Sequence, residues 1–475
     1  MENNVILADD KRQFQKEQDQ MLNTLLTYRF FNPWRGIITT STEQSLAMDS
    51  SLEIYLTNTC NQRCEYCYLV KYPELYPQDK NNPKNILHNL KLLYDYIMVN
   101  NFHIPLLDVF SGEIWHTQFG IDVLELTLNY VEKGMNIDSM LIPTNCYFVK
   151  NNKTLHKIQT LIHKFEQVGV SLQFSLSIDG KIADEYTRPP ASGEPYSDEF
   201  YERVFTFAKF NNFKFHPMVS AANIKCWKEN YKWWEQMLEY YDFDLMDIMM
   251  LEVRNNDWTD DTIEAYCDFI TFLADEYFEK KCDNDYNLFA NSIVNIRTEE
   301  DKIKLYGYVP WLLNKTDTFL GCTVSNHLTV RIGDLAICPC HRQAYDKYLY
   351  GYFTVEDDTI TGIRAVNPQM AVRILLGNVH TISPRCSMCI YNKCCMHGCF
   401  GSQLETNADP FFPIDSVCKF FKAKYHTILQ YYRDKGLIDY YKQIHPNEFH
   451  TELADFVLKM EKLDREVYRN GVGKC

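Results

Sequence analysis

The chain has 475 residues, a mass of 56.1 kDa and 17 cysteines. Hydrophobic residues make up 46% and charged residues 23%, which excludes disordered, collagen-like and low-complexity classes. With 48 basic against 63 acidic residues the net charge is −15, which argues against nucleic acid as a partner.

The N-terminal region gives an expectation about the compartment. Its first 20 residues are polar and charged, without the basic start, apolar core and cleavage site of a secretory signal. No apolar run approaches the ~20 residues that a membrane span needs. We therefore expect a cytoplasmic protein with no membrane partner, in which clustered and reduced cysteines bind metal more often than they form disulfides.

Short apolar runs alternate with longer amphipathic stretches, which is typical of βα units and a mostly parallel sheet. Helical spacing of apolar residues predicts helices over 83–100 and 258–280, the second with Thr259 as its N-cap. The predicted strands are 52–56, 106–110, 139–143, 170–178, 213–219 and 246–253. The sequence thus predicts an α/β fold.

A cysteine triplet with the spacing C-x3-C-x2-C follows the first predicted strand: Cys60, Cys64 and Cys67. Three thiolates on one loop can hold three irons of a four-iron cluster and leave the fourth iron open for chemistry. A zinc site normally has four protein ligands in paired C-x2-C spacing, so zinc fits this loop poorly. The loop therefore predicts an iron–sulfur centre.

On this triplet the sequence resembles the radical S-adenosylmethionine (radical SAM) superfamily, which implies a partial (β/α)6 barrel. The family's Gly-Gly-Glu-Pro motif is matched in part by the segment Ser111-Gly112-Glu113-Ile114. The segment Thr144-Asn145-Cys146 resembles the family's Thr-Asn-Gly, with cysteine in the place of glycine. Ser177-Ile178-Asp179-Gly180 resembles the end of a segment that lies near the SAM ribose, and Arg188 follows at the spacing of an arginine that meets the SAM carboxylate.

The resemblance implies a set of SAM-binding residues whose chemistry suits the ligand. A carboxylate suits an ammonium group and a ribose diol, and arginine suits a carboxylate. Taken alone, such side chains are more often solvated loop charges or ion pairs, and only their order after the triplet favours a site. The implied set is Tyr66, Ser111, Gly112, Glu113, Asn145, Ser177, Asp179 and Arg188.

A second group of cysteines follows one long pattern. It runs C-x10-G-x4-C from Cys322 to Cys338, then C-x2-C-x5-C-x3-C from Cys386 to Cys399, and ends at Cys418. This pattern is similar to the SPASM domain, a C-terminal extension of radical SAM enzymes that holds two auxiliary [4Fe–4S] clusters. The resemblance places Cys386, Cys389, Cys395 and Cys418 on one cluster, and Cys322, Cys338 and Cys399 on the other.

The second auxiliary cluster lacks a fourth ligand from the pattern. Cys340 could close this site, or it could replace Cys338 as a ligand. The iron could also stay open and accept a substrate thiolate. These three arrangements are open.

The resemblance implies SAM and three [4Fe–4S] clusters as cofactors, a peptide or protein substrate, and an external electron donor of the flavodoxin or ferredoxin type. Sulfatase-maturating enzymes share the layout but carry an acidic base just after a motif cysteine, where this chain has Pro339 and His341. We therefore expect thioether or carbon–carbon crosslinking of a ribosomally made peptide.

Alternatives to this function are formylglycine formation or another dehydrogenation, and, in a different class, a non-catalytic protein stabilised by zinc or a cluster. The expected divisions are a helical extension over 1–50, the barrel over 51–257, a helical linker over 258–318, the SPASM domain over 319–425 and a helical tail over 426–475.

Overall fold

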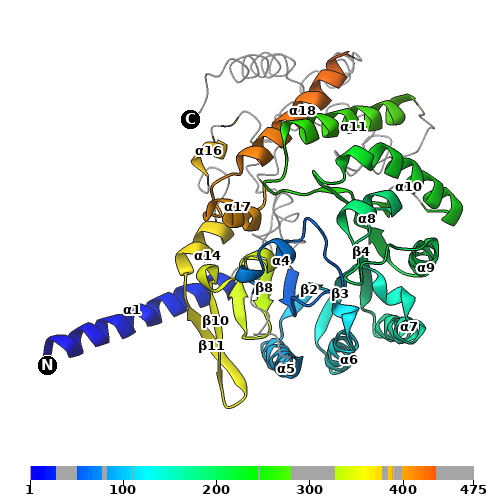
Figure 1. Cartoon of the computed structure of the whole chain (residues 1–475). Helices are drawn as coiled ribbons and strands as arrows, with labels where there is room; N and C mark the ends of the chain where they lie inside the picture. The colour runs from blue at the N-terminus through cyan, green and yellow to red at the C-terminus, as the bar shows by residue number, and fades with distance from the viewer. Residues whose placement is uncertain are drawn as a thin grey trace, which may run out of the picture. The chain divides into compact units, whose positions relative to one another are not determined.

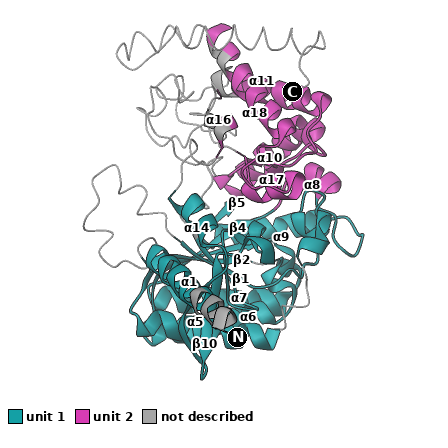
Figure 2. Cartoon of the chain, turned by 90° about the vertical axis from the view of Figure 1, so that its left-hand side faces the viewer, with its two compact units in different colours: residues 1–177, 188–214, 323–377 teal, residues 178–187, 215–322, 378–475 magenta. Residues whose placement is uncertain are grey.

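The computed structural model describes residues 2–27, 51–76, 83–110, 112–243, 247–279, 327–376, 383–387, 389 and 398–434. The chain divides into two compact units (Figure 2). Unit 1 comprises residues 1–177, 188–214 and 323–377, and unit 2 comprises residues 178–187, 215–322 and 378–475. The domain boundaries expected from the sequence stay a prediction.

A sheet of nine strands, in the order β11-β10-β9-β8-β1-β2-β3-β4-β5, organises unit 1. β1 pairs in parallel with β2, β2 with β3 and β3 with β4. These four strands confirm the first four predicted ones. Their bounds are β1 Ser51–Tyr55, β2 His103–Phe110, β3 Asn136–Thr144 and β4 Ser171–Leu176.

Helices cover one face of the parallel strands (Figure 1). On this helix-covered face Phe174 of β4 is buried and its ring contacts Phe207. On the opposite face, which we call the inner face, Phe110 of β2 lies against Tyr55 of β1. The helices are α5 Pro83–Val99, which confirms the helix predicted over 83–100, α6 Phe119–Glu132, α7 Asn152–Gln167 and α9 Asp198–Lys209.

The sheet of unit 1 continues beyond β1 into residues that the sequence analysis assigns to the auxiliary domain. β8 (His327–Arg331) pairs in parallel with β1, and β9 (Ala336–Cys338), β10 (Gly351–Glu356) and β11 (Thr359–Ala365) follow antiparallel. The N-terminal helix α1 (Glu2–Leu26) covers the outer edge of β11. Gln15 Nε2 donates to the carbonyl of Ala365 at 2.9 Å, and Asp19 Oδ1 accepts from the N–H of Ala365 at 2.7 Å.

The described part of unit 2 is mainly helical, with one parallel pair of short strands, β6 (Met218–Val219) and β7 (Leu251–Glu252). The predicted strand over 213–219 is divided into β5 (Phe213–Phe215) and β6, because Pro217 between them has no N–H to give to a ladder. The strand predicted over 246–253 is reduced to β7 among the described residues. The helices are α8 Lys181–Thr187, α10 Trp227–Tyr241, α11 Asp260–Glu279, α16 Pro384–Ser387, α17 Phe400–Asn407 and α18 Asp415–Asp434.

An aromatic cluster forms the core between α11 and α18. The ring of Phe420 lies 4.3 Å from that of Trp258 and 4.5 Å from that of Tyr266. α11 confirms the helix predicted over 258–280, and Thr259 Oγ1 accepts from the N–H of Thr262 at 3.4 Å, as an N-cap does. Within the described part of the chain, no helix has the length and apolar character needed to cross a membrane.

Candidate metal and cofactor site

The cysteine triplet lies on the loop that leaves β1 in unit 1. The N–H of Cys67 donates to the carbonyl of Cys64 at 3.0 Å, and Cys67 then caps the short helix α4 (Tyr68–Lys71). Cys60 Sγ accepts from the N–H of Gln62 at 3.4 Å and from Asn145 Nδ2 at 3.7 Å. All three thiols are partly exposed, so an inorganic cluster can reach them.

Two thiols of this loop, those of Cys60 and Cys67, hold their protons more tightly than a free cysteine. Burial, with the nearby Glu113 carboxyl as a smaller cause, raises the pKa of Cys60 to about 11. Burial also raises the pKa of Cys67. A metal that binds these thiols must displace their protons, so binding couples to proton release.

The loop after β2 is bonded directly to the cysteine loop. The N–H of Gly112 donates to Thr57 O at 2.6 Å, and the N–H of Glu113 donates to Thr59 O at 2.9 Å. A Cβ added at Gly112 would lie 2.5 Å from Thr59 O and 2.8 Å from Asn58 O, so only glycine fits. The neighbouring Ser111 lies outside the described residues.

Glu113 is a buried carboxylate with a full set of neutral donors. Its side chain accepts from the N–H of Trp115 at 3.2 Å and from Thr144 Oγ1 at 2.9 Å through Oε1, and from the N–H of Asn145 at 2.6 Å through Oε2. Burial raises the pKa of Glu113 to about 7, although these hydrogen bonds and the charge of Arg188 act to lower it. The site is therefore prepared for a cation that would favour the ionised form.

The loop after β3 brings Asn145 to the cysteine loop. Asn145 Nδ2 donates to Asn61 Oδ1 at 2.7 Å as well as lying near Cys60. The next residue, Cys146, is fully buried and has φ = 66°, in the left-handed region that favours glycine. Cys146 therefore adopts a backbone conformation that glycine reaches at lower cost.

Arg188 contacts the cysteine loop and is the first residue of the second chain segment of unit 1. It is 5% exposed, and its guanidinium donates to Tyr66 Oη at 2.7 Å and to Gln62 Oε1 at 3.1 Å. Ser177 is anchored by its own N–H, which donates to Thr144 O at 2.8 Å. Five of the eight predicted SAM residues thus surround the triplet through these contacts: Tyr66, Gly112, Glu113, Asn145 and Arg188.

Asp179 lies in unit 2 and is fully buried. Its Oδ1 accepts from the N–H of Met218 at 2.8 Å, and its Oδ2 accepts from Thr187 Oγ1 at 2.7 Å. The side chain therefore holds the end of α8 and the start of the strand β6. Its role toward a ribose stays a prediction.

Three of the predicted auxiliary ligands lie together in unit 2. The N–H of Cys389 donates to the carbonyl of Cys386 at 3.1 Å. The pKa of Cys418 is raised to about 11 by burial and, less strongly, by the thiols of Cys386 and Cys389, while Arg385 lowers it. Cys399, also in unit 2, precedes α17 as its N-cap. Cys322 and Cys395 lie outside the described residues.

Cys338 and Cys340 lie in unit 1 and differ in accessibility. Cys338, at the end of β9, is fully buried in an apolar cluster with Tyr55 and Ala344, and burial raises its pKa to about 12. Cys340 is partly exposed, and its Sγ lies 3.8 Å from Gln343 Oε1. Of this pair, Cys340 is the thiol that a cluster reaches with less rearrangement.

The described residues contain no three His, Cys, Asp or Glu side chains that converge as around a single metal ion. A four-iron cluster binds each thiolate through a separate iron atom, so its ligands need not converge on one point. The donor set of the triplet, three thiols on one loop, fits such a cluster.

Sequence reasoning missed two polar residues of the site, Gln62 and Thr144. Gln62 joins the triplet to the arginine, because its side chain accepts from Arg188 and from Cys64 Sγ at 3.3 Å. Thr144 anchors Glu113. Only their positions within or beside the motif segments could have indicated these two residues from the sequence.

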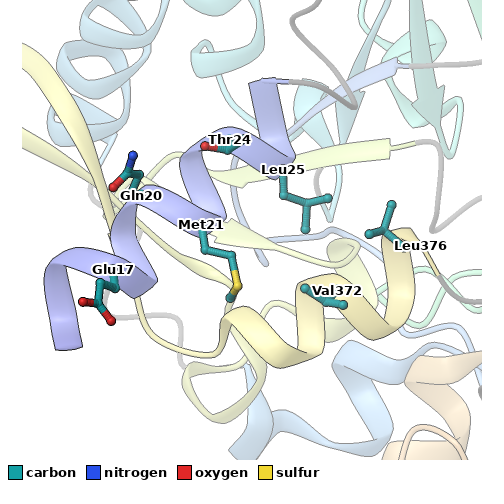
Figure 3. Close-up of a pocket in the computed structure, with 7 residues that line it drawn as sticks. All are labelled: Glu17, Gln20, Met21, Thr24, Leu25, Val372 and Leu376. Atoms are coloured by element: carbon teal, nitrogen blue, oxygen red, sulfur yellow. The ribbon is translucent and has the colours of Figure 1, made fainter.

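A separate apolar groove of about 540 Å³ lies in unit 1 between α1 and α14 (Pro368–Leu375) (Figure 3). None of the predicted site residues lines it. Its lining is Glu17, Gln20, Met21, Thr24, Leu25, Val372 and Leu376.

Solved structures with a similar fold are known. The chain is similar to native anSMEcpe, an anaerobic sulfatase-maturing enzyme, with bound AdoMet and Cp18Cys peptide: the TM-score is 0.51 and the identity 15%, over 83% of this chain and 99% of that one. For hexahistidine-tagged anSMEcpe with bound AdoMet the TM-score is 0.53 and the identity 16%, over 86% and 98%. SuiB of Streptococcus suis, bound to S-adenosylmethionine, gives a TM-score of 0.44 at 14% identity, over 80% and 78%.

No protein-family model and no curated protein matches the sequence. The likeness to the two anSMEcpe structures shows that this chain has their fold. The fold class expected from the sequence is thereby confirmed.

Proposed function

We propose that the chain is a radical SAM enzyme that binds SAM beside a cluster held by Cys60, Cys64 and Cys67. The observation that carries this proposal is the direct bonding of Glu113, Asn145 and Arg188 to the cysteine loop or its neighbours. The AdoMet bound in both anSMEcpe structures supports it.

When bound, the cluster and SAM would supply the chemistry of the first step, the reductive cleavage of SAM that makes a radical able to remove a hydrogen atom from the substrate. The chain's own residues bind and orient SAM. The Glu113 carboxylate would hold the ammonium group and Arg188 the carboxylate. The partners of Arg188 at Tyr66 and Gln62 are neutral, so they orient its guanidinium without cancelling its charge.

The remaining members of the SAM set, Ser111, Ser177 and Asp179, are proposed from the family resemblance alone. The Asp179 carboxylate has lone pairs beyond the two that Met218 and Thr187 use, so a ribose hydroxyl is chemically compatible with it.

We extend the proposal to two auxiliary clusters. The group formed by Cys386, Cys389 and Cys418 supports the first, with Cys395 as the fourth ligand. The second would use Cys322, Cys338 and Cys399, and the greater accessibility of Cys340 favours a part for it in this site. A cytoplasmic location and an external flavodoxin or ferredoxin type donor belong to the same proposal.

Iron content and SAM cleavage test this function. After anaerobic reconstitution we expect about 12 irons per chain, since three clusters each carry about four. Reduction with dithionite should then release 5′-deoxyadenosine from SAM. Cys64→Ala should abolish cleavage and lower the iron content by about a third, whereas Cys267→Ala, at a cysteine of α11 outside both motifs, should change neither.

The proposed substrate is a ribosomally made peptide that contains cysteine, and the reaction is thioether or carbon–carbon crosslinking. The peptide bound in one anSMEcpe structure supports a peptide substrate. A peptide encoded beside this gene should become lighter by two hydrogens per crosslink after reaction. A cysteine that instead loses its sulfur and gains an aldehyde would establish formylglycine formation, the alternative reaction. Bound zinc without SAM cleavage would establish a non-catalytic protein.

A further inference from the structure

Two carboxyl groups lie side by side on the inner face of the unit 1 sheet. Glu53 of β1 and Asp108 of β2 are register partners in a parallel pair, so their side chains leave the sheet on the same side. That side also carries Phe110, whose ring stacks on His341 with the centroids 3.7 Å apart. Both carboxyls stand two residues before the carboxyl ends of their strands, and the cysteine loop follows one of these ends.

Glu53 is a saturated acceptor. It is 2% exposed, and its Oε1 accepts from the N–H of His341 and from Thr329 Oγ1, both at 2.9 Å. Its Oε2 lies 2.7 Å from His341 Nδ1. Two donors and an imidazole nitrogen within hydrogen-bond distance of one carboxyl group favour its ionised form.

Asp108 has the opposite environment. It is 8% exposed, and its Oδ1 has no hydrogen-bond partner among the described residues. Native proteins rarely leave a buried polar atom without a partner, and such an atom needs an explanation. Its register partner on β3 is Leu141, which is not titratable, so Glu53 and His341 are the titratable groups that act on it.

The surroundings of Asp108 favour its protonated form. Burial and, less strongly, the negative charge of Glu53 together raise the pKa of Asp108 to about 8, while His341 acts to lower it. Because Glu53 has these partners while Asp108 Oδ1 has none among the described residues, we assign the proton of the pair to Asp108. A carboxyl group with a pKa close to a working pH suits proton transfer.

We propose that Asp108 is the acid–base residue of the inner face, held in position by Glu53 and His341, and that its Oδ1 exchanges a proton with the peptide substrate. The identity of the substrate rests on the proposed function. For a thioether, the SAM-derived radical would remove a hydrogen atom from carbon, and the cysteine thiol would give its proton to the ionised fraction of Asp108 as the carbon–sulfur bond forms. The remaining electron would pass to an auxiliary [4Fe–4S] cluster, so the peptide would lose two hydrogens in all.

Infrared difference spectroscopy tests the protonation state without any substrate. In the reconstituted protein at about pH 6, the wild type minus Asp108→Asn spectrum should contain the C=O stretch of a protonated carboxylic acid, shifted in D2O. This band should disappear as the pH rises through about 8, and in Glu53→Gln the same transition should occur at lower pH. Absence of the band at about pH 6 would overturn the proposal.

Product analysis tests the role in the reaction. With the cognate peptide, Asp108→Asn should form 5′-deoxyadenosine at a rate close to that of the wild type but crosslinked peptide about 100-fold more slowly, with partial rescue in Asp108→Glu. Asp138→Asn, at an exposed position of β3, is the matched control and should keep both rates. Crosslinking by Asp108→Asn at the wild-type rate would also overturn the proposal. Failure of all variants and the wild type to cleave SAM would reject the proposed function, while the infrared result still decides whether Asp108 holds the proton.

Discussion

Glu113 Oε2 accepts a hydrogen bond of 2.6 Å from the backbone N–H of Asn145. This bond joins the loop after β2 to the loop after β3, while the N–H of Glu113 bonds the cysteine loop through Thr59 O. Through its carboxylate and its backbone N–H together, Glu113 therefore connects three loops at the carboxyl ends of parallel strands, where active sites of barrels form.

The first prediction concerns the pH dependence of SAM binding through Glu113. Because burial raises its pKa to about 7, the fraction of ionised Glu113 grows as the pH rises through that value. If the ionised form holds the SAM ammonium group, affinity at about pH 8 should exceed that at about pH 6 by roughly tenfold, the gain in ionised fraction. Calorimetric titration of reconstituted protein with SAM measures this change.

Glu113→Gln is the control, because the ionisable groups of SAM titrate in the same way with either protein and only the carboxyl group of Glu113 is removed. Its affinity should be lower and should lack the part of the pH response that Glu113 provides. The free energy of unfolding of the ligand-free protein should change in the opposite direction. Because folding raises the pKa of Glu113, this free energy should fall as the pH rises from about 4.5 to about 7. Equal pH responses of the two proteins would contradict the role of Glu113.

A second prediction follows from the close approach at Gly112. Gly112→Ala places a Cβ 2.5 Å from the carbonyl oxygen of Thr59, and neither backbone segment can yield as a side-chain tip would. We expect a loss of about 1–3 kcal/mol in the free energy of unfolding and weaker SAM binding. Gly362→Ala on β11 meets only Thr354 Oγ1 at 3.4 Å, so it should cost clearly less and leave SAM binding unchanged. Urea unfolding under anaerobic conditions, together with calorimetric titration with SAM, gives both values.

A third prediction separates the charge of Arg188 from its geometry. Its guanidinium reaches Tyr66 and Gln62 at once, which the single ammonium of lysine cannot reproduce. Arg188→Lys should weaken SAM binding by about tenfold or more, since a bidentate contact to the SAM carboxylate is lost. Tyr66→Phe keeps the charge and should have a smaller effect. Equal affinities of the lysine variant and the wild type would contradict carboxylate binding by Arg188.

The sequence predicted those parts of the fold that depend on local periodicity. Four parallel strands and the helices α5 and α11 lie where apolar spacing places them. The pairing of β8 with β1 was not predictable, because 272 residues or more separate the two strands in the chain and no local pattern reports such a contact. The split of the fifth strand is explained by Pro217, whose effect on the ladder the periodicity did not weigh.

The site residues also fall into those that local sequence patterns predict and those that only the strand pairing reveals. Motif spacing identified Glu113 and Arg188, which lie beside the cysteine loop. Glu53 and Asp108 were missed because a single acidic residue within an apolar strand resembles a solvent-facing position in an alternating pattern. Only their common register, at Glu53 opposite Asp108, puts both charges on the inner face.

The last prediction concerns unit 2 and the helix that carries Cys418. Lys424 of α18 and Glu252 of β7 form an ion pair in which each side chain is 6% exposed, and Tyr266 Oη also donates to Glu252 at 2.5 Å. Burial alone would raise the pKa of Glu252, but the charge of Lys424 outweighs it and holds that pKa below its usual value. The pair therefore contributes stability above the unfolded pKa of about 4.5, and this contribution is lost as the pH falls through the lower folded value.

Removal of one partner of this pair leaves a buried charge without compensation. Lys424→Met should lower the free energy of unfolding by about 3–5 kcal/mol, and the double variant with Glu252→Gln should recover most of that loss. Lys419→Met is the matched control, because Lys419 lies on the surface of the same helix and pairs with Asp260 of α11, and both side chains are more than half exposed. Its cost should stay below about 1 kcal/mol. Since α18 also positions Cys418, Lys424→Met should reduce the iron content after reconstitution and Lys419→Met should not. Urea unfolding and iron analysis of the three variants check this, and equal stability of Lys424→Met and Lys419→Met would show that the buried pair is not required.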